Sequence, residues 1–85
     1  MMDAHLVVQS HRDFGAQLRV ARRERQLTQA QAAVLAGVGV RLWNEAENGR
    51  RAQVGLETAL RMLQAVGVEL RLVMRLVGAG EDGAR

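Results

Sequence analysis

The chain has no cysteine and no proline, and its aromatic residues are one Trp and one Phe. Without cysteine, neither a disulfide nor a thiolate-bound metal can hold the fold together. With so few aromatic residues, the apolar content comes from Ala, Val and Leu, which suits helices. The 85 residues are enough for one small domain. A domain of this size buries only part of its surface, so dimerisation would stabilise it.

Lysine is absent as well, because all 12 basic residues are Arg. Arg suits the bidentate recognition of phosphate and guanine. The codon preference of a GC-rich genome, however, explains most of this bias. The net charge of +3 fits a nucleic-acid-binding protein without requiring one.

Long apolar runs, a signal peptide and the usual catalytic constellations are also missing, so we expect a cytoplasmic protein with no membrane partner. His5 and His11 lack metal-ligand spacing, and no Ser/His/Asp set or Gly-rich phosphate loop is present. Glu45 and Glu47, two positions apart on a predicted helix, point in different directions and cannot act as an acid/base pair. The sequence therefore predicts a protein that is not an enzyme and has no cofactor or metal site.

Residues 27–50 predict two short helices joined by a tight turn. Thr28 is a good N-cap and can close a capping box with Gln31, and Gly37 can end the first helix in the left-handed conformation. We expect the second helix over residues 40–48, followed by Gly49 with a positive φ. This is the pattern of a helix-turn-helix, whose second helix enters the DNA major groove.

Two further helices flank this motif. The first is expected from about residue 11 to 25, with Ser10 as its N-cap. The last is expected from about residue 56 to 66, with Leu56, Leu60 and Leu63 facing inward.

The apolar pattern changes after residue 67. Apolar residues then recur at every second position, 68, 70, 72, 74 and 76, which is strand periodicity. A continuing helix is the less favoured alternative, because Val-rich alternation argues against it. A lone strand is a template for another chain, so we infer that it pairs across a two-fold axis. The dimerisation residues would be Val68, Leu70, Leu72 and Met74.

Four segments follow from these patterns. Residues 1–9 form an N-terminal arm or short strand, and 10–67 the helix-turn-helix DNA-binding domain. Residues 68–77 form the dimerisation strand, and 78–85 a disordered tail. Whether residues 5–8 pair with the C-terminal strand is left open.

The chain resembles the Xre-type helix-turn-helix family, which includes the lambdoid phage repressors and Cro. The matching residues are Arg22, Leu27-Thr28-Gln29, Ala33, Gly37-Val38 and Glu47-Asn48-Gly49-Arg50. The predicted C-terminal strand, with the run from Leu63 to Leu72, is similar more narrowly to HipB-type antitoxins. The resemblance implies a mainly α, four- to five-helix lambda-repressor-like domain whose terminal β-strand pairs across a dimer.

The resemblance also implies roles for particular residues. Gln29 would bind a phosphate, and the loop of Asn48, Arg50 and Arg51 would meet the DNA backbone. Arg22 and Glu47 would form a structural salt bridge between the first and third helices. Trp43 stands where the family has Ile or Val, and we expect it in the core, filling space left by neighbouring alanines.

The start and exposed face of the second helix of the motif supply the base-reading candidates. Arg41 can read guanine, and Asn44 can read adenine or hold a phosphate. Glu45 can either accept from cytosine or stand as a solvated charge. Gly39 is a weaker cap than the family's Ser or Thr, and Val40 could touch a thymine methyl. The predicted DNA-binding residues are therefore Gln29, Gly39, Val40, Arg41, Asn44, Glu45, Asn48, Arg50 and Arg51.

Together these features predict a bacterial, homodimeric, sequence-specific repressor that binds a palindromic operator in double-stranded DNA. The narrower resemblance implies an antitoxin that represses its own operon and binds a HipA-like kinase toxin. One alternative is a protein-binding module that chiefly neutralises such a toxin. Another is a stand-alone phage-type repressor without a toxin.

Overall fold

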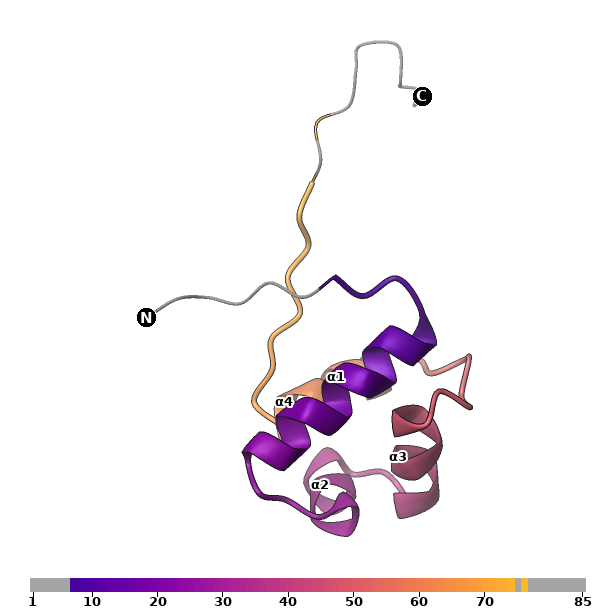
Figure 1. Cartoon of the computed structure of the whole chain (residues 1–85), viewed down its shortest axis with the longest axis vertical. Helices are drawn as coiled ribbons and strands as arrows, with labels where there is room; N and C mark the ends of the chain where they lie inside the picture. Colours follow the sequence, from indigo (N-terminus) through magenta and orange to yellow (C-terminus); the bar gives the residue numbers. More distant parts are fainter. Residues whose placement is uncertain (1–6, 75, 77–85) are drawn as a thin grey trace.

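The computed structural model describes residues 7–74 and 76, and these contain four helices. In chain order they are α1 (His11–Glu24), α2 (Gln29–Ala36), α3 (Val40–Glu47) and α4 (Leu56–Ala65), arranged as shown in Figure 1. The fold is mainly helical, as expected, and the helix bounds lie within one residue of the predicted ones. None of the described helices is long and apolar enough to cross a membrane.

Local capping explains where α2 begins and ends. Thr28 Oγ1 accepts a hydrogen bond from the Gln31 backbone N–H at 3.0 Å, and Gln31 Oε1 accepts one from the Thr28 N–H at 2.8 Å. This is the expected capping box, which satisfies two N–H groups that a helix end leaves free. Gly37, with a φ of 72°, then turns the chain away in the left-handed conformation.

The core is built from small residues around one large one. Trp43 is fully buried, which confirms its predicted place in the core. Helix α2 packs against α3 and α4, and α1 packs against α3. The buried apolar residues are Leu18, Ala32, Ala33, Ala36, Trp43, Ala46, Met62, Leu63 and Val66.

Gly15 sets the distance between α1 and α3. It is buried in the middle of α1, and a methyl group on its Cα would overlap the carbonyl oxygen of Ala46 in α3. Only glycine permits this approach of the two helices. The sequence analysis did not identify this role.

The inward face of α4 differs from the expected one. Leu63 is buried, but Leu56 is 68% exposed and Leu60 is only partly buried. Met62 and Val66 fill the core instead. The buried side chains therefore gather in the second half of α4 and at its C-cap, whereas the first two residues of the helix are exposed.

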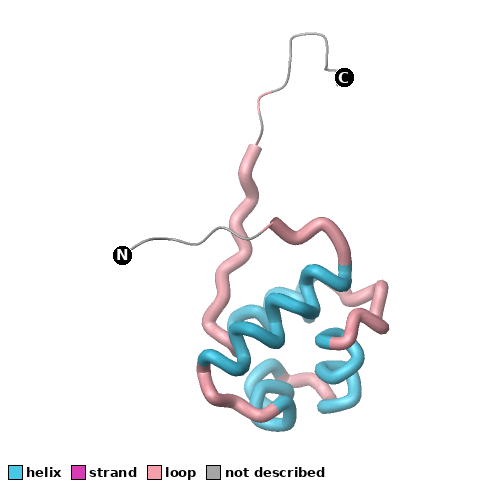
Figure 2. The backbone as a smooth tube through the Cα atoms, viewed as in Figure 1, coloured by secondary structure: helices cyan, strands magenta, loops and turns pink. Residues whose placement is uncertain are grey.

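The expected strand over 68–77 is not seen in the part of this segment that the structure describes. Residues 68–74 and 76 are assigned no strand, and Figure 2 shows residues 68–74 leaving the helices without a neighbouring strand. A strand exists only through hydrogen bonds to a partner strand, and none of the residues that the structure describes supplies one. Val7 and Val8 form no strand either, while residues 1–6 and the expected tail at 78–85 lie outside the described ranges.

Candidate nucleic-acid interface

The two helices of the motif are joined by the side chain of Gln29, the first residue of α2. Its Nε2 donates to Glu47 Oε1 at 2.9 Å, and its Oε1 accepts from Asn44 Nδ2 at 3.0 Å. Both partners lie on α3. Gln29 therefore sets how α3 sits against the start of α2, where backbone N–H groups and the helix dipole favour a phosphate.

Glu47 lies at the centre of a buried polar network. Its carboxylate is fully buried and accepts from Arg22 Nε at 2.5 Å and from Arg22 Nη2 at 3.0 Å. Trp43 Nε1 donates to the same carboxylate at 2.6 Å. Arg22 Nη1 also donates to the carbonyl oxygen of Leu27 at 2.8 Å, so its guanidinium ties α1 to both the α1–α2 turn and α3.

This network shifts the ionisation of both charged partners. Burial alone would raise the pKa of Glu47, but hydrogen bonds from Arg22, Gln29 and Trp43 and the charge of Arg22 outweigh burial and lower it to about 2. The hydrogen bond to Glu47 raises the pKa of Arg22. Both groups are charged at neutral pH, so an ion pair joins Arg22 on α1 to Glu47 at the end of α3.

Arg19 extends the network to the end of α3. Its Nη2 donates to Asn48 Oδ1 at 2.7 Å, and its Nε lies 3.5 Å from Glu47 Oε1. Asn48 Nδ2 in turn donates to Asn44 Oδ1 at 3.2 Å. Arg19, Asn48, Asn44, Gln29 and Glu47 therefore form a closed ring of side-chain contacts. In this conformation Asn44 is hydrogen-bonded to both Gln29 and Asn48, which are predicted DNA-binding residues like Asn44 itself.

The outer face of α3 carries the residues that remain free for a ligand. Val40 is 50% exposed, and the Arg41 side chain is 91% exposed. The half-buried Glu45 accepts from Arg41 Nε at 3.1 Å and lies 3.4 Å from Arg51 Nε. Arg41 and Arg51 are thus held on two sides of one carboxylate.

The ends of α3 carry the remaining predicted contacts. Gly39 precedes the helix and makes no side-chain cap, as its lack of a hydroxyl requires. After α3, Gly49 has a φ of 70°, as predicted, and Arg50 is exposed. The structure therefore gathers the nine predicted DNA-binding residues at the start of α2, along α3 and in the loop after it.

Sequence reasoning missed two members of this network. Arg19 stands one helical turn before Arg22 on α1, and Trp43 stands one turn before Glu47 on α3, so spacing places each on the same face as its partner. That spacing could have revealed the Trp43 hydrogen bond once Glu47 was taken as buried. The contacts from Arg19 need the packing of α1 on α3, which spacing alone does not provide.

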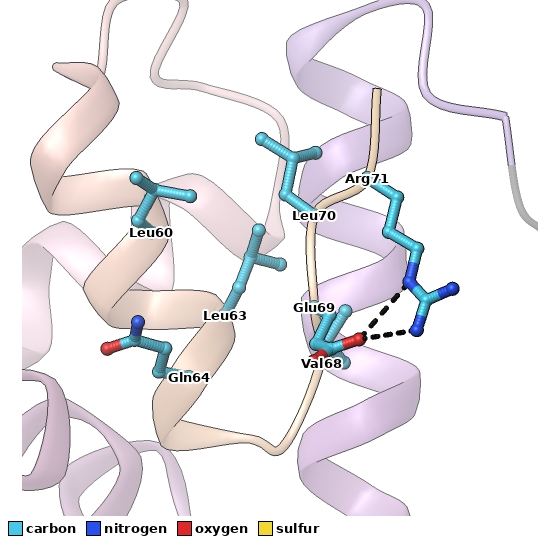
Figure 3. A pocket seen from close by; sticks show the side chains of 7 residues that line it. All are labelled: Leu60, Leu63, Gln64, Val68, Glu69, Leu70 and Arg71. Atoms are coloured by element: carbon cyan, nitrogen blue, oxygen red, sulfur yellow. Dashed lines mark hydrogen bonds and ion pairs between the residues drawn. The ribbon is translucent and has the colours of Figure 1, made fainter. Parts of the chain in front are cut away.

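The predicted dimerisation residues lie away from this surface. Val68 packs against the core, Leu70 is 50% exposed, and Leu72 and Met74 are at least 90% exposed. A groove runs between α4 and the start of this segment, and Figure 3 shows its lining. Its lining residues are Leu60, Leu63, Gln64, Val68, Glu69, Leu70 and Arg71.

Comparison with known proteins identifies the class. The family model described as a helix-turn-helix domain matches residues 13–76. The chain belongs to this helix-turn-helix family. The match confirms the Xre-type resemblance inferred from the motif residues. Helices α2 and α3 are the two helices of this DNA-binding motif.

Solved structures agree with this assignment. The restriction-modification controller protein C.AhdI from Aeromonas hydrophila is 30% identical, with a TM-score of 0.65 over 69% of this chain and 88% of that one. A HipB variant in complex with the O2 20mer matches at 20% identity and a TM-score of 0.72, covering 84% and 97%. The HipA-HipB-O2-O3 complex matches at 18% identity and 0.71, covering 82% and 97%. The last two share the fold. No curated protein sequence matches the chain.

Proposed function

We propose that this helix-turn-helix protein is a homodimeric, sequence-specific transcriptional repressor, acting as the antitoxin of an operon that it represses itself. The observation that carries the DNA-binding part is the coupling of α2 to α3 through Gln29 and Glu47. That coupling fixes the inner side of α3 and leaves Val40 and Arg41 exposed on its outer side. A rigid helix with an exposed, basic first turn suits insertion into the major groove.

The dimer part rests on apolar surface that the single chain leaves uncovered. Leu72 is 93%, Met74 90% and Leu76 94% exposed, and the three alternate along one face of the segment. Contiguous exposed apolar residues mark an interaction site. The alternation over residues 68–76 fits pairing with the same segment of a second copy, which would form the strand that one chain lacks.

A two-fold dimer determines the form of the DNA site. Two copies of α3 related by that axis would enter successive major grooves, so the operator should be a palindrome with half-sites about 34 Å apart. Binding should weaken steeply as salt increases, because phosphate neutralisation by arginines such as Arg50 and Arg51 releases counterions.

The antitoxin part is supported by the resemblance to HipB-type antitoxins and by the fold shared with HipB over most of both chains. A HipA-like kinase would then be the protein partner, in the cytoplasm of a bacterium. The second candidate is a repressor without a toxin. The 30% sequence identity to the restriction-modification controller protein C.AhdI favours this candidate. The two candidates differ in whether a kinase gene neighbours the coding region.

The test of DNA binding is a titration of the full chain against the duplex immediately upstream of its own coding region, at two salt concentrations. Wild type should bind this duplex more tightly than a scrambled duplex of equal length. Arg41→Ala should lose this preference. The charge-preserving Arg41→Lys should weaken it, because a lysine ammonium lacks the rigid planar pair of N–H donors that a guanidinium presents to guanine O6 and N7. Equal binding of both duplexes by wild type would contradict the repressor assignment.

The test of the dimer is sedimentation of the full chain. Leu72→Asp places a carboxylate in the proposed apolar strand face and should convert the dimer to a monomer. Val73→Asp places the same charge on the other face of the segment and serves as the matched control. A wild-type chain that sediments as a monomer at micromolar concentration would contradict the dimer.

A further inference from the structure

Glu45 occupies the centre of the surface that α3 presents. Its two carboxylate oxygens are used separately: Oε2 accepts from Arg41 Nε at 3.1 Å, and Oε1 lies 3.4 Å from Arg51 Nε. Its side chain is 26% exposed, whereas that of Arg41 is 91% exposed. The Glu45 side chain is therefore much more covered by the rest of the domain than the Arg41 side chain is.

This contact leaves the outer end of Arg41 available. Only Nε of Arg41 takes part in a hydrogen bond within the described part of the chain. A bidentate contact to guanine O6 and N7 needs two N–H donors in a fixed plane. An arginine held at Nε keeps its two Nη groups for such a contact and loses part of its freedom before binding, which lowers the entropy that binding must remove.

The charge of Glu45 repels nearby phosphates whatever the base sequence of the DNA. A carboxylate near the backbone opposes binding to any DNA sequence, because non-specific affinity comes from phosphate neutralisation. Its attraction for Arg41 and Arg51 must also be given up wherever these side chains turn toward phosphates instead. Both effects weaken non-specific binding. They weaken specific binding less, because at a specific site Arg41 can contact a base while its Nε stays bonded to Glu45.

We propose that Glu45 is a positioning residue that holds Arg41 for base recognition and suppresses non-specific binding, rather than a residue that touches a base itself. This inference rests on the proposed sequence-specific function. It replaces the expectation that Glu45 accepts a hydrogen bond from cytosine. An exposed ion pair adds little to folding stability, so the effect of Glu45 belongs in the specificity of DNA binding.

The test is selection of binding sites from a random duplex library by the full-length wild type, Glu45→Gln, Arg41→Ala and the double variant. Affinities are then measured for the selected site and for a scrambled duplex of equal length. Glu57→Gln, which removes the same charge from an exposed side chain on α4, is the matched control. Thermal unfolding of each variant checks that the fold is retained.

We expect Glu45→Gln to raise affinity for the scrambled duplex by about two- to fivefold, the size of an exposed ion pair. It should relax sequence preference at the same base pair that Arg41→Ala relaxes, with no further relaxation in the double variant. Preference lost at a different base pair would show that Glu45 reads a base and would overturn the proposal. So would unchanged selectivity and scrambled-duplex affinity in Glu45→Gln. A wild type that selects no sequence would instead overturn the proposed function, and this inference with it.

Discussion

Trp43 Nε1 donates a hydrogen bond to Glu47 Oε2 at 2.6 Å, between two fully buried side chains one turn apart on α3. The indole thus fills the apolar core with its ring and serves the polar network with its N–H. The same carboxylate holds Arg22 from α1 and Gln29 from α2. The buried carboxylate of Glu47, on α3, therefore ties this helix to both α1 and α2.

Removal of Glu47 should strongly destabilise the domain. Glu47→Ala leaves the guanidinium of Arg22 buried without its counter-charge, which costs roughly 3–5 kcal/mol. A small domain has only about 5–15 kcal/mol of stability in total. Urea unfolding followed by circular dichroism measures the change. Glu57→Ala, at an exposed ion pair on α4, should change stability by less than about 0.5 kcal/mol. Equal effects of the two variants would contradict the central role of Glu47.

Acid should unfold the protein through the same carboxylate. The folded pKa of Glu47 is about 2, below the ordinary value of 4.5. The stabilisation is therefore complete above pH 4.5 and is lost as the pH falls toward 2. The difference corresponds to roughly 3 kcal/mol at about 1.4 kcal/mol per pKa unit.

Urea unfolding at a series of pH values, followed by circular dichroism, measures this loss. Trp43→Phe removes one donor to Glu47 and so raises the folded pKa of that carboxyl. The loss of stability should begin near pH 4.5 in both proteins, but in the variant it should end at a higher pH and be smaller in total. Circular dichroism serves both proteins, because this variant lacks the single Trp whose fluorescence could be followed in wild type. An unfolding free energy that stays constant between pH 5 and pH 2.5 would contradict the shifted pKa.

Local features explain why the helices could be predicted from the sequence. The capping box of Thr28 and Gln31 and the turn at Gly37 each depend on residues a few positions apart. Because such contacts need only residues close together in the sequence, the bounds of α2 could be predicted from its local signals. Gln29 and Arg41 could be assigned to the motif in the same way, because they lie in the first turns of its two helices.

Contacts between distant elements could not be read in this way. The ring that includes Arg19 and Asn48 joins residues 29 positions apart and depends on the packing of α1 on α3. The exposure of Leu56 depends on where the other helices end, which periodicity does not report. The strand predicted over residues 68–77 would need hydrogen bonds from a second chain, so the alternating pattern can suggest it but the described residues of a single chain do not form it.

Gly15 should tolerate no side chain. Gly→Ala within a helix ordinarily stabilises by about 0.5–1 kcal/mol. At Gly15 the added methyl overlaps the carbonyl oxygen of Ala46, so α1 and α3 must move apart. We expect Gly15→Ala to destabilise by about 1–3 kcal/mol. Thermal unfolding measures this change in stability. Gly55→Ala is the control, because a methyl group at Gly55 meets nothing within 4 Å. Stabilisation by Gly15→Ala would show that the two helices do not pack this closely.

The register of the proposed dimer strand can be predicted from its sequence. An antiparallel pair centred on Leu72 aligns all of residues 68–76 and places the apolar residues of both copies on one face. It also sets Glu69 opposite Arg75 of the second copy. Centres at residue 71 or 73 would instead set Arg71 opposite itself or opposite Arg75, which like-charge repulsion disfavours.

A single cysteine tests this register without interference, because the chain has none of its own. Two copies of Leu72→Cys would lie directly opposite each other, with Cα atoms about 4.5–5.5 Å apart, within the range of a disulfide. Two copies of Leu70→Cys would be offset by four residues along the strands, or about 13 Å. Under mild oxidation, non-reducing electrophoresis should therefore show a covalent dimer for Leu72→Cys and a monomer for Leu70→Cys. The reverse pattern would move the axis to residue 70. A dimer in sedimentation that neither cysteine cross-links would contradict both of these registers.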